Sequence, residues 1–200
     1  MSPQTFIFIG RSGCGKGTQA DLLQKYLKTQ DPGREVFYLE TGNRFRDFIK
    51  DENLSSKLSL DISHRGDRQP DFLAVWVWAH LFIENLKGDE HIIIDGTPRS
   101  INEARVLDSA VRFYNREPAK VIYLNVSRAW AEKRLSGRGR TDDRSLLEVK
   151  KRLDWFETDV LPAVNHLREH PEYRFFDING EQSLEEVHQS IMREIFKVGK

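Results

Sequence analysis

The stretch that decides the fold begins with the apolar run Phe6-Ile7-Phe8-Ile9 and continues as Gly10-Arg11-Ser12-Gly13-Cys14-Gly15-Lys16-Gly17-Thr18. A short, continuous apolar run that ends at a glycine is typical of a strand buried on both faces of a sheet. The residues that follow predict a helix from Lys16 to about Thr29. Four glycines in eight residues allow the backbone N–H groups to turn inward around an anion, and the helix N-terminus adds its positive end. The sequence therefore predicts a strand, a phosphate-binding loop and a helix.

This loop fits the phosphate-loop pattern G-x-x-x-x-G-K, but Gly17 occupies the usual Ser/Thr position and Thr18 comes one residue later. Lys16 can reach the outer phosphates of a nucleotide. Cys14 lies inside the loop, and we assign it no chemistry because phosphoryl transfer needs no thiol nucleophile. The alternative is a glycine-rich turn without a ligand. The coincidence of strand, glycines, lysine and helix favours the phosphate-binding interpretation.

Four further strands are predicted from runs of β-branched and aromatic residues, at positions 36–39, 92–94, 121–124 and 173–178. A long apolar helix begins at Pro70-Asp71 and stops at Gly88, and S-x-x-E spacing marks helix starts at Ser100, Ser145 and Ser183. Strands that alternate with helices predict an α/β fold, with a parallel sheet covered by helices. Residues 42–71 are more polar and lack a strand pattern, so we expect an insertion there.

The length and composition of the chain argue against several classes of protein. At 200 residues the chain predicts a single domain, 1–200, since domains average about 150 residues. The 31 basic and 31 acidic residues cancel, which argues against a protein that coats nucleic acid. One cysteine excludes an internal disulfide and a cysteine-rich zinc site. The apolar stretch 72–83 is too short to span a membrane, and the start lacks a positively charged signal region. We expect a soluble protein of a reducing compartment.

Arginines follow the predicted strand ends. Arg46 comes shortly after the second strand and Arg99 after the third; Arg134, Arg138 and Arg140 fall within seven residues, and Arg152 lies on the following helix. Because ligands bind beyond the carboxyl ends of parallel strands, we expect these side chains to converge on one cleft. The planar guanidinium suits phosphate oxygens, and phosphoryl transfer is chiefly positioning and charge neutralisation. The alternative is a solvated, salt-bridged surface.

Asp95 ends the third predicted strand, directly before Gly96. A carboxylate at this position can hold Mg²⁺, directly or through water. The alternative is a turn aspartate that stabilises the loop. Beside a phosphate-binding loop, the metal role is favoured.

These motifs together resemble the adenylate kinase family of nucleoside monophosphate kinases, nearly from end to end. The similar segments are Gly10 to Gln19, Thr41-Gly42 with Arg46, Gly66 to Asp71, Asp95-Gly96-Thr97-Pro98-Arg99, and the arginines from Arg134 to Arg152. The resemblance implies a P-loop three-layer fold with a five-stranded parallel sheet in the order 2-3-1-4-5. It also implies the reaction ATP + NMP ⇌ ADP + NDP with Mg²⁺, and two mobile parts that close over the substrates.

The resemblance also implies residue roles. The catalytic set is Lys16, Arg99, Arg138, Arg140 and Arg152. The ATP-binding set is Gly13, Cys14, Gly15, Lys16, Gly17 and Thr18, with Arg134 stacking on the base. The set that binds the monophosphate is Thr41, Gly42, Arg46, Gln69, Gly96, Arg99 and Glu103, while Asp95 supports Mg²⁺ through water. Residues 42–71 would form a small helical subdomain that binds the monophosphate, and residues 136–142 a vestigial lid.

The sequence departs from the family pattern in four places. Ser12 replaces the loop proline, and Asn43 replaces the acid after Thr-Gly. Only Gly139 separates Arg138 from Arg140, so the lid is almost absent and offers no place for the zinc-bearing lid of some relatives. We therefore expect no zinc. The fourth departure is Glu103, which stands where adenylate kinases usually have a glutamine that reads adenine.

Glu103 leaves the choice of base open. An ionised carboxylate only accepts hydrogen bonds, so it matches the N1–H and N2–H₂ of guanine better than the N1 acceptor of adenine. If Glu103 reads the base, Glu103→Gln should raise kcat/KM for AMP relative to GMP. The alternative is that Glu103 belongs to the capping box of Ser100. We expect AMP as the acceptor, with GMP, UMP or CMP as the alternative.

Two other functions are weighed. The segment His166-Leu167-Arg168-Glu169-His170 matches the H-x-x-E-H pattern of some zinc peptidases, but Pro171 disfavours helical geometry at His170. A non-catalytic nucleotide-binding module would keep the loop and lose the acceptor arginines, yet these are present. The expected protein is a monomeric, cytoplasmic enzyme that binds small nucleotides, not nucleic acid or membranes.

Overall fold

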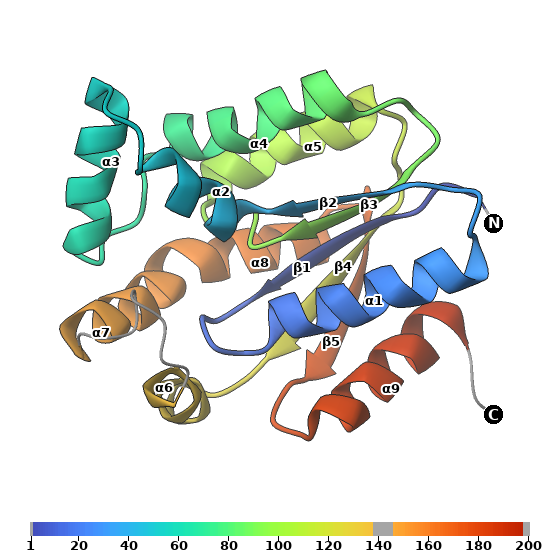
Figure 1. Cartoon of the computed structure of the whole chain (residues 1–200). Coiled ribbons are helices and arrows are strands. Elements are labelled where there is room, and N and C mark those ends of the chain that lie inside the picture. Colours follow the sequence, from blue (N-terminus) through green and yellow to red (C-terminus); the bar gives the residue numbers. More distant parts are fainter. Residues whose placement is uncertain (1, 138–145, 198–200) are drawn as a thin grey trace.

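The computed structural model describes residues 2–137 and 146–197, and its centre is a five-stranded parallel sheet (Figure 1). The strands are β1 (Thr5–Gly10), β2 (Val36–Glu40), β3 (His91–Asp95), β4 (Ala119–Asn125) and β5 (Tyr173–Asn179). Their order is β2-β3-β1-β4-β5, which confirms the order that the family resemblance implied. All five strands coincide with the runs predicted from the sequence.

Helices cover both faces of the sheet (Figure 1). The helices before β4 are α1 (Lys16–Gln30), α2 (Thr41–Phe48), α3 (Leu54–His64), α4 (Asp71–Asn85) and α5 (Ile101–Phe113). Those after β4 are α6 (Arg128–Ser136), α7 (Leu146–Trp155), α8 (Leu161–Glu169) and α9 (Leu184–Phe196). The central strand β1 shows why two layers form: Phe6 and Phe8 join the core cluster under α1 and α9, while Ile7 and Ile9 join the cluster under α4, α5 and α8.

Strand register brings three chain segments to one edge of the sheet. Phe8 of β1 pairs with Asp95 of β3, and Glu40 of β2 pairs with the same aspartate. The phosphate-binding loop therefore leaves β1 beside the ends of β2 and β3. This edge is the place where the sequence predicts a ligand cleft.

Helix starts follow the predicted capping signals where the structure describes them. Ser183 forms a complete capping box with Glu186 at the start of α9. Ser100 caps α5 by accepting a hydrogen bond from the backbone N–H of Glu103. Ser145 lies outside the described residues.

Residues 42–71 carry helices α2 and α3 and no strand, as the sequence predicts, and α3 lies away from the sheet (Figure 1). The loop after α3 contacts α7. Lys151 Nζ donates to the carbonyl oxygen of Arg65 at 2.8 Å and to Asp67 Oδ1 at 3.1 Å. Gly66 has φ +71°, and a Cβ added there would lie 2.9 Å from the Cα of Glu148. A glycine is therefore required for this loop to approach α7 so closely.

Neither α6 nor the turn that follows α7 was predicted from the sequence. A π-helical turn, Phe156–Val160, interrupts the helical run between α7 and α8. The guanidinium of Arg11, from the phosphate-binding loop, lies 4.3 Å above the centre of the Phe156 ring, and Arg11 also pairs with Glu157. The π-helical turn therefore packs against the loop, and such turns occur often at functional sites. Within the two described ranges, no helix is both long and apolar enough to cross a membrane.

Candidate active site

A cavity of about 890 Å³ opens at the carboxyl edge of the sheet. Its wall combines the phosphate-binding loop, the ends of β2 and β3, the loop after α3, and residues of α6 and α7. Thirteen residues predicted for the site line it: Gly13, Gly15, Lys16, Gly17, Thr18, Gly42, Arg46, Gln69, Asp95, Gly96, Arg99, Arg134 and Arg152. Residues that are far apart in the chain thus border one space, which is the convergence expected from the strand-end rule.

The phosphate-binding loop is curled around its own lysine. Lys16 Nζ donates to the carbonyl oxygens of Gly10 at 2.8 Å and Arg11 at 2.9 Å, so the ammonium lies over the loop. Gly15 has φ +98° and is the residue before α1 begins, where its left-handed conformation turns the chain into the helix. The positive end of α1 and the ammonium therefore face the same part of the cavity, where a polyphosphate would bind.

Asp95 faces this loop from the end of β3. Its residue is only 7% exposed, and burial raises the pKa of its carboxyl, an effect opposed by the positive charges of Lys16 and Arg99. The hydroxyl of Tyr38 donates to Asp95 Oδ2 at 3.5 Å. A Cβ added to Gly17 would lie 3.4 Å from the same oxygen, so the first turn of α1 and the carboxylate are close neighbours.

Two arginines meet around Gly42. A Cβ added there would lie 3.3 Å from Arg46 Nη1 and 3.8 Å from Arg99 Nη2. Arg46 Nη2 donates to Glu40 Oε1 at 3.1 Å, and Arg99 Nε donates to the carbonyl oxygen of Gly96 at 2.7 Å. Both side chains, held by these bonds, line the cavity.

The charges of these arginines act on one another. The pKa of Arg99 is lowered, first by burial and then by the like charges of Arg46 and Arg152. The opposite charges of Glu103 and Asp95 counter this lowering, and the three guanidinium groups, from α2, the β3–α5 loop and α7, line one cavity. Guanidinium groups suit phosphate oxygens, so this part of the cavity is a candidate phosphate site.

The remaining predicted residues occupy different places. Cys14 and Thr41 are buried and do not border the cavity, and Thr41 Oγ1 is hydrogen-bonded to Thr97 Oγ1 at 2.7 Å. The Gln69 amide is engaged with Ser59, accepting from its hydroxyl and donating to its carbonyl oxygen, each at 2.9 Å. Arg134 is exposed and lies 4.9 Å from the centre of the Trp130 ring. Arg138 and Arg140, and residues 138–142 of the predicted lid, lie outside the described residues.

Glu103 is fully buried at the start of α5 and does not border the cavity. Its Oε2 accepts a hydrogen bond from the backbone N–H of Arg99 at 2.6 Å, instead of closing a capping box on Ser100. Burial raises the pKa of this carboxyl, and the nearby Arg99 opposes the rise. In this structure the side chain supports the loop that carries Arg99.

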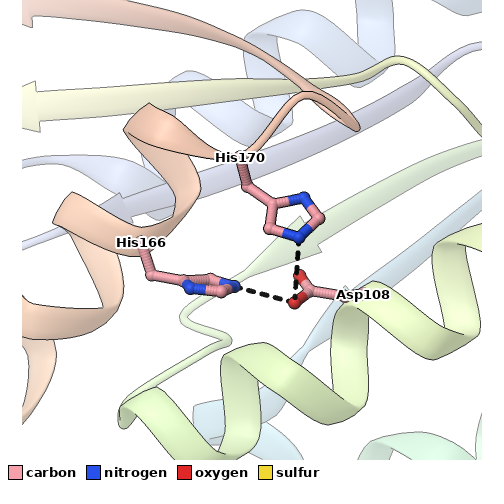
Figure 2. Close-up of side chains that lie close together, drawn as sticks. All are labelled: Asp108, His166 and His170. Carbon is pink, nitrogen blue, oxygen red and sulfur yellow. Dashed lines mark hydrogen bonds and ion pairs between the residues drawn. The ribbon is translucent and has the colours of Figure 1, made fainter.

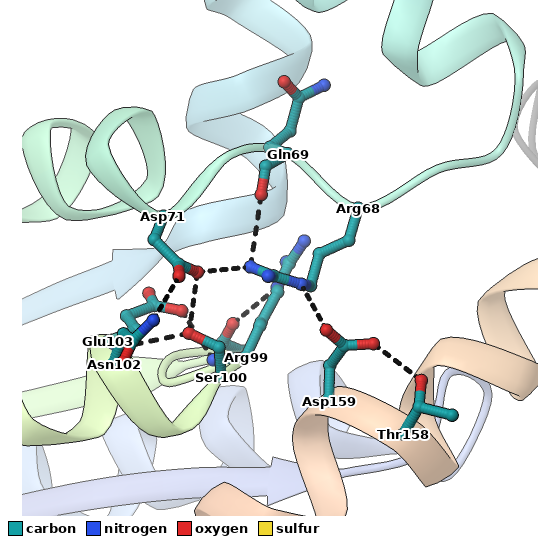
Figure 3. Close-up of polar contacts among 10 residues, drawn as sticks. Arg68, Gln69, Asp71, Arg99, Ser100, Asn102, Glu103, Thr158 and Asp159 are labelled. Atoms are coloured by element: carbon teal, nitrogen blue, oxygen red, sulfur yellow. Dashed lines mark hydrogen bonds and ion pairs between the residues drawn. The ribbon is translucent and has the colours of Figure 1, made fainter.

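Arg68, which was not predicted as a site residue, links the insertion 42–71 to the rest of the cavity wall. Figure 3 shows Arg68 between Asp71 and Asp159: its Nη1 donates to Asp71 Oδ1 at 2.6 Å and its Nε to Asp159 Oδ1 at 3.3 Å. Asp71 also accepts from Ser100 Oγ at 2.7 Å and from Asn102 Nδ2 at 3.0 Å. Arg68 lies inside the segment Gly66–Asp71, so its place in that segment could have marked it as a site residue.

The fold and cavity define a P-loop enzyme that handles phosphate groups. The family model described as adenylate kinase matches residues 8–172. The adenylate kinase of Azobacteroides pseudotrichonymphae is 30% identical over 192 residues, which cover 93% of this chain and 94% of that protein. The adenylate kinase of Leptospira biflexa serovar Patoc is 30% identical over 194 residues, covering 94% and 98%, and adenylate kinase 1 of Nostoc sp. is 28% identical over 181 residues, covering 90% and 92%. The chain belongs to the adenylate kinase family, and it is a nucleoside monophosphate kinase.

Proposed function

We propose that the protein catalyses the reversible reaction ATP + AMP ⇌ 2 ADP. The observation that carries this proposal is the geometry of the cavity. The phosphate-binding loop with Lys16 lies on one part of its wall, and Arg46 and Arg99 lie on another. The family membership supports the phosphotransferase class, and the relatives described above carry the name adenylate kinase.

Each cation has a proposed role. Lys16 and the N–H groups of the loop hold the ATP phosphates, and Arg134 stacks on the ATP base. Arg46 and Arg99 bind the monophosphate. Arg152, which reaches the cavity from α7, stabilises the transferring phosphoryl group together with Arg138 and Arg140. No protein nucleophile is needed, since positioning and charge neutralisation supply the rate.

Mg²⁺ is the metal that this family implies, and the residues present fit it. Asp95 offers buried carboxylate oxygens beside the first turn of α1, and Thr18 adds a hydroxyl to the cavity wall. Oxygen ligands from one or two side chains suit Mg²⁺, which otherwise keeps its waters and binds phosphates. When bound, the ion neutralises charge that develops on the phosphate oxygens.

We propose that the insertion, residues 42–71, is the monophosphate-binding subdomain and that it closes over the substrates. The contacts of Lys151 with the loop after α3, and of Arg68 with Asp159, hold this insertion against α7 and the π-helical turn. A closed wall excludes water, which suppresses ATP hydrolysis. We propose that residues 136–142 act as a very short lid, and that the enzyme is a cytoplasmic monomer.

The acceptor base is tested by mixing ATP and Mg²⁺ with AMP, GMP, CMP or UMP in turn and measuring ADP formation. We expect AMP to give the highest kcat/KM. A higher value for another monophosphate would replace the proposed substrate, and no ADP with any of the four would indicate a non-catalytic nucleotide-binding module.

Glu103→Gln is expected to change kcat/KM for AMP and GMP by the same factor. The side chain is buried outside the cavity wall, and a glutamine oxygen can still accept the hydrogen bond from Arg99. The measurement is the ratio of the two kcat/KM values in the variant and in the wild type. A rise of the AMP:GMP ratio in the variant would instead support base reading by this residue.

The same variant is expected to gain stability relative to the wild type as pH rises. Because burial raises the pKa of Glu103 above its ordinary value of 4.5, the folded protein binds this proton more tightly than the unfolded chain does. The resulting stability is complete below 4.5 and is lost as pH rises through the folded pKa. Glutamine does not ionise. Urea unfolding between about pH 4.5 and 7.5 should therefore show wild-type stability falling relative to the variant, and a constant difference would contradict the proposed cost of burying the charge.

A further inference from the structure

A second cluster of chemistry-bearing side chains lies away from the cavity (Figure 2). It consists of Asp108 from α5 and two histidines, His166 of α8 and His170 just after that helix. His166 Nε2 lies 2.7 Å from Asp108 Oδ2, and His170 Nε2 lies 3.9 Å from the same oxygen. Ligand atoms of all three residues lie within 4.8 Å of one another. Figure 2 shows both rings turned toward the one carboxylate.

The backbone explains how the two histidines meet. His170 has an extended conformation, with φ −82° and ψ 129°, as expected before Pro171. Its N–H nevertheless donates to the carbonyl oxygen of His166 at 3.0 Å, so the last turn of α8 closes, and the ring centres lie 5.0 Å apart. Residues four apart thus share one face, although the helix ends between them.

The cluster lies at the amino ends of the strands, whereas the cavity lies at their carboxyl ends. It borders the start of β5, and Tyr173, the first residue of that strand, donates its hydroxyl to Asp108 Oδ1 at 2.6 Å. A strand of this length spans about 20 Å, so the cluster is remote from the phosphate-binding loop. Asp108, His166 and His170 are described residues that do not border the cavity.

Two buried polar atoms beside the cluster have no hydrogen-bond partner in the described structure: His170 Nδ1 and Glu172 Oε2. They lie 3.8 Å apart, too far for a hydrogen bond but close enough for a small shift of the ring to make one. A histidine that binds a metal through one ring nitrogen usually donates the other N–H to a carboxylate. Glu172 is placed to be that acceptor, while His170 Nε2 faces Asp108.

We propose that Asp108, His166 and His170 bind a divalent transition-metal ion of the zinc type. Two imidazole nitrogens and one carboxylate oxygen are a common protein ligand set for Zn²⁺, with water in the fourth position. Tetrahedral ligands at 2.0–2.1 Å from zinc are about 3.3 Å apart, between the two measured separations from Asp108. The histidine side chains are 21% and 26% exposed, so an ion and a water molecule can reach the site.

With these three ligands the ion links α5 to the end of α8, beside the start of β5. A peptidase is not supported, because Glu169, the acid of the H-x-x-E-H pattern, is exposed and is not part of the cluster. The sequence-based expectation of no zinc rested on the single cysteine and the short lid. The proposed site uses neither, and its third ligand comes from a residue 58 positions before His166.

The test measures Zn²⁺ binding to the full chain after treatment with a chelator and exchange into nucleotide-free, chelator-free buffer, with excess Mg²⁺ to compete at the active site. Wild type should bind one Zn²⁺ per chain in competition with a chromophoric chelator. Loss of a carboxylate that only hydrogen-bonds to a metal ligand costs roughly 10–100-fold in metal affinity, so Glu172→Gln should lower the Zn²⁺ affinity within this range. His170→Gln removes a ligand itself and should lower the Zn²⁺ affinity by more. His188→Gln, which changes a histidine elsewhere, should bind Zn²⁺ as the wild type does.

Folding and activity measurements distinguish the loss of a metal ligand from the loss of the fold. The His170 ring nitrogens lie 3.8 and 3.9 Å from the neighbouring carboxylates, beyond hydrogen-bond distance, so His170→Gln should fold and keep the wild-type kcat with Mg²⁺. Co²⁺ added in place of Zn²⁺ should give visible absorption bands of a four-coordinate ion in wild type and lose them in the variant. Equal Zn²⁺ affinity of wild type and His170→Gln, or no stoichiometric binding to the wild type, would overturn the proposal.

Discussion

Lys16→Ala should reduce kcat for ADP formation by roughly 10²–10³-fold, the cost of removing one preorganised charge from a transition state. The ammonium lies over the phosphate-binding loop, where the ATP phosphates are proposed to bind. The variant also loses two hydrogen bonds to loop carbonyl oxygens, so the loop is less well held. The core beneath it is unchanged, since β1 is buried through its own apolar side chains.

The measurement is kcat under saturating ATP and AMP, together with far-UV circular dichroism to check the fold. Lys28→Ala provides the matched control, because Lys28 is an exposed residue of the same helix. Its kcat should equal that of the wild type. Turnover of Lys16→Ala within a few-fold of the wild type would refute the phosphate role of this lysine.

Arg99→Ala should raise KM for AMP by about 10²-fold or more and leave KM for ATP nearly unchanged. A guanidinium binds phosphate through two parallel hydrogen bonds, and bonds to charged groups are worth about 1.5–3 kcal/mol each. Arg99 is already held in place, by the carbonyl oxygen of Gly96 at its Nε and by Glu103 at its backbone N–H. Its loss should therefore remove the preorganised contact that we propose for the monophosphate.

Arg105→Ala is the matched control for this substitution. Arg105 lies on α5 and is exposed, so it tests the loss of one positive charge near the site without loss of a cavity side chain. Both KM values should remain at their wild-type levels. Equal losses of AMP and ATP affinity in Arg99→Ala would overturn the assignment of Arg99 to the monophosphate.

Much of this fold could be predicted because its signals are local. The run Phe6–Ile9 is apolar at every position because helices cover both faces of the sheet. The alternation of apolar and polar residues that marks a half-buried strand is therefore absent. The strand ends then locate Asp95, Arg46 and Arg99 at one edge without further information. The same rule places Glu40, which accepts a hydrogen bond from Arg46, at this edge, but Glu40 was not predicted as a site residue.

Other features depend on contacts between distant segments and have no local signal. Glu103 has capping-box spacing, yet its carboxylate bonds to Arg99 because the loop before α5 brings that N–H closer. The pairing of Asp108 with His166 joins two helices that come together only when α5 and α8 pack on the same face of the sheet. The π-helical turn likewise packs against Arg11, which comes from a distant part of the chain.

We propose that cations from separate segments of the chain surround two facing nucleotides in one cavity. The most direct test of this claim is calorimetric titration with two adenosines joined by five phosphates, a molecule that fills both nucleotide positions at once. We predict that one molecule binds per chain, and that Lys16→Ala and Arg99→Ala each weaken binding strongly while Lys28→Ala does not. Two molecules bound per chain, or an affinity that neither active-site substitution changes, would contradict the claim.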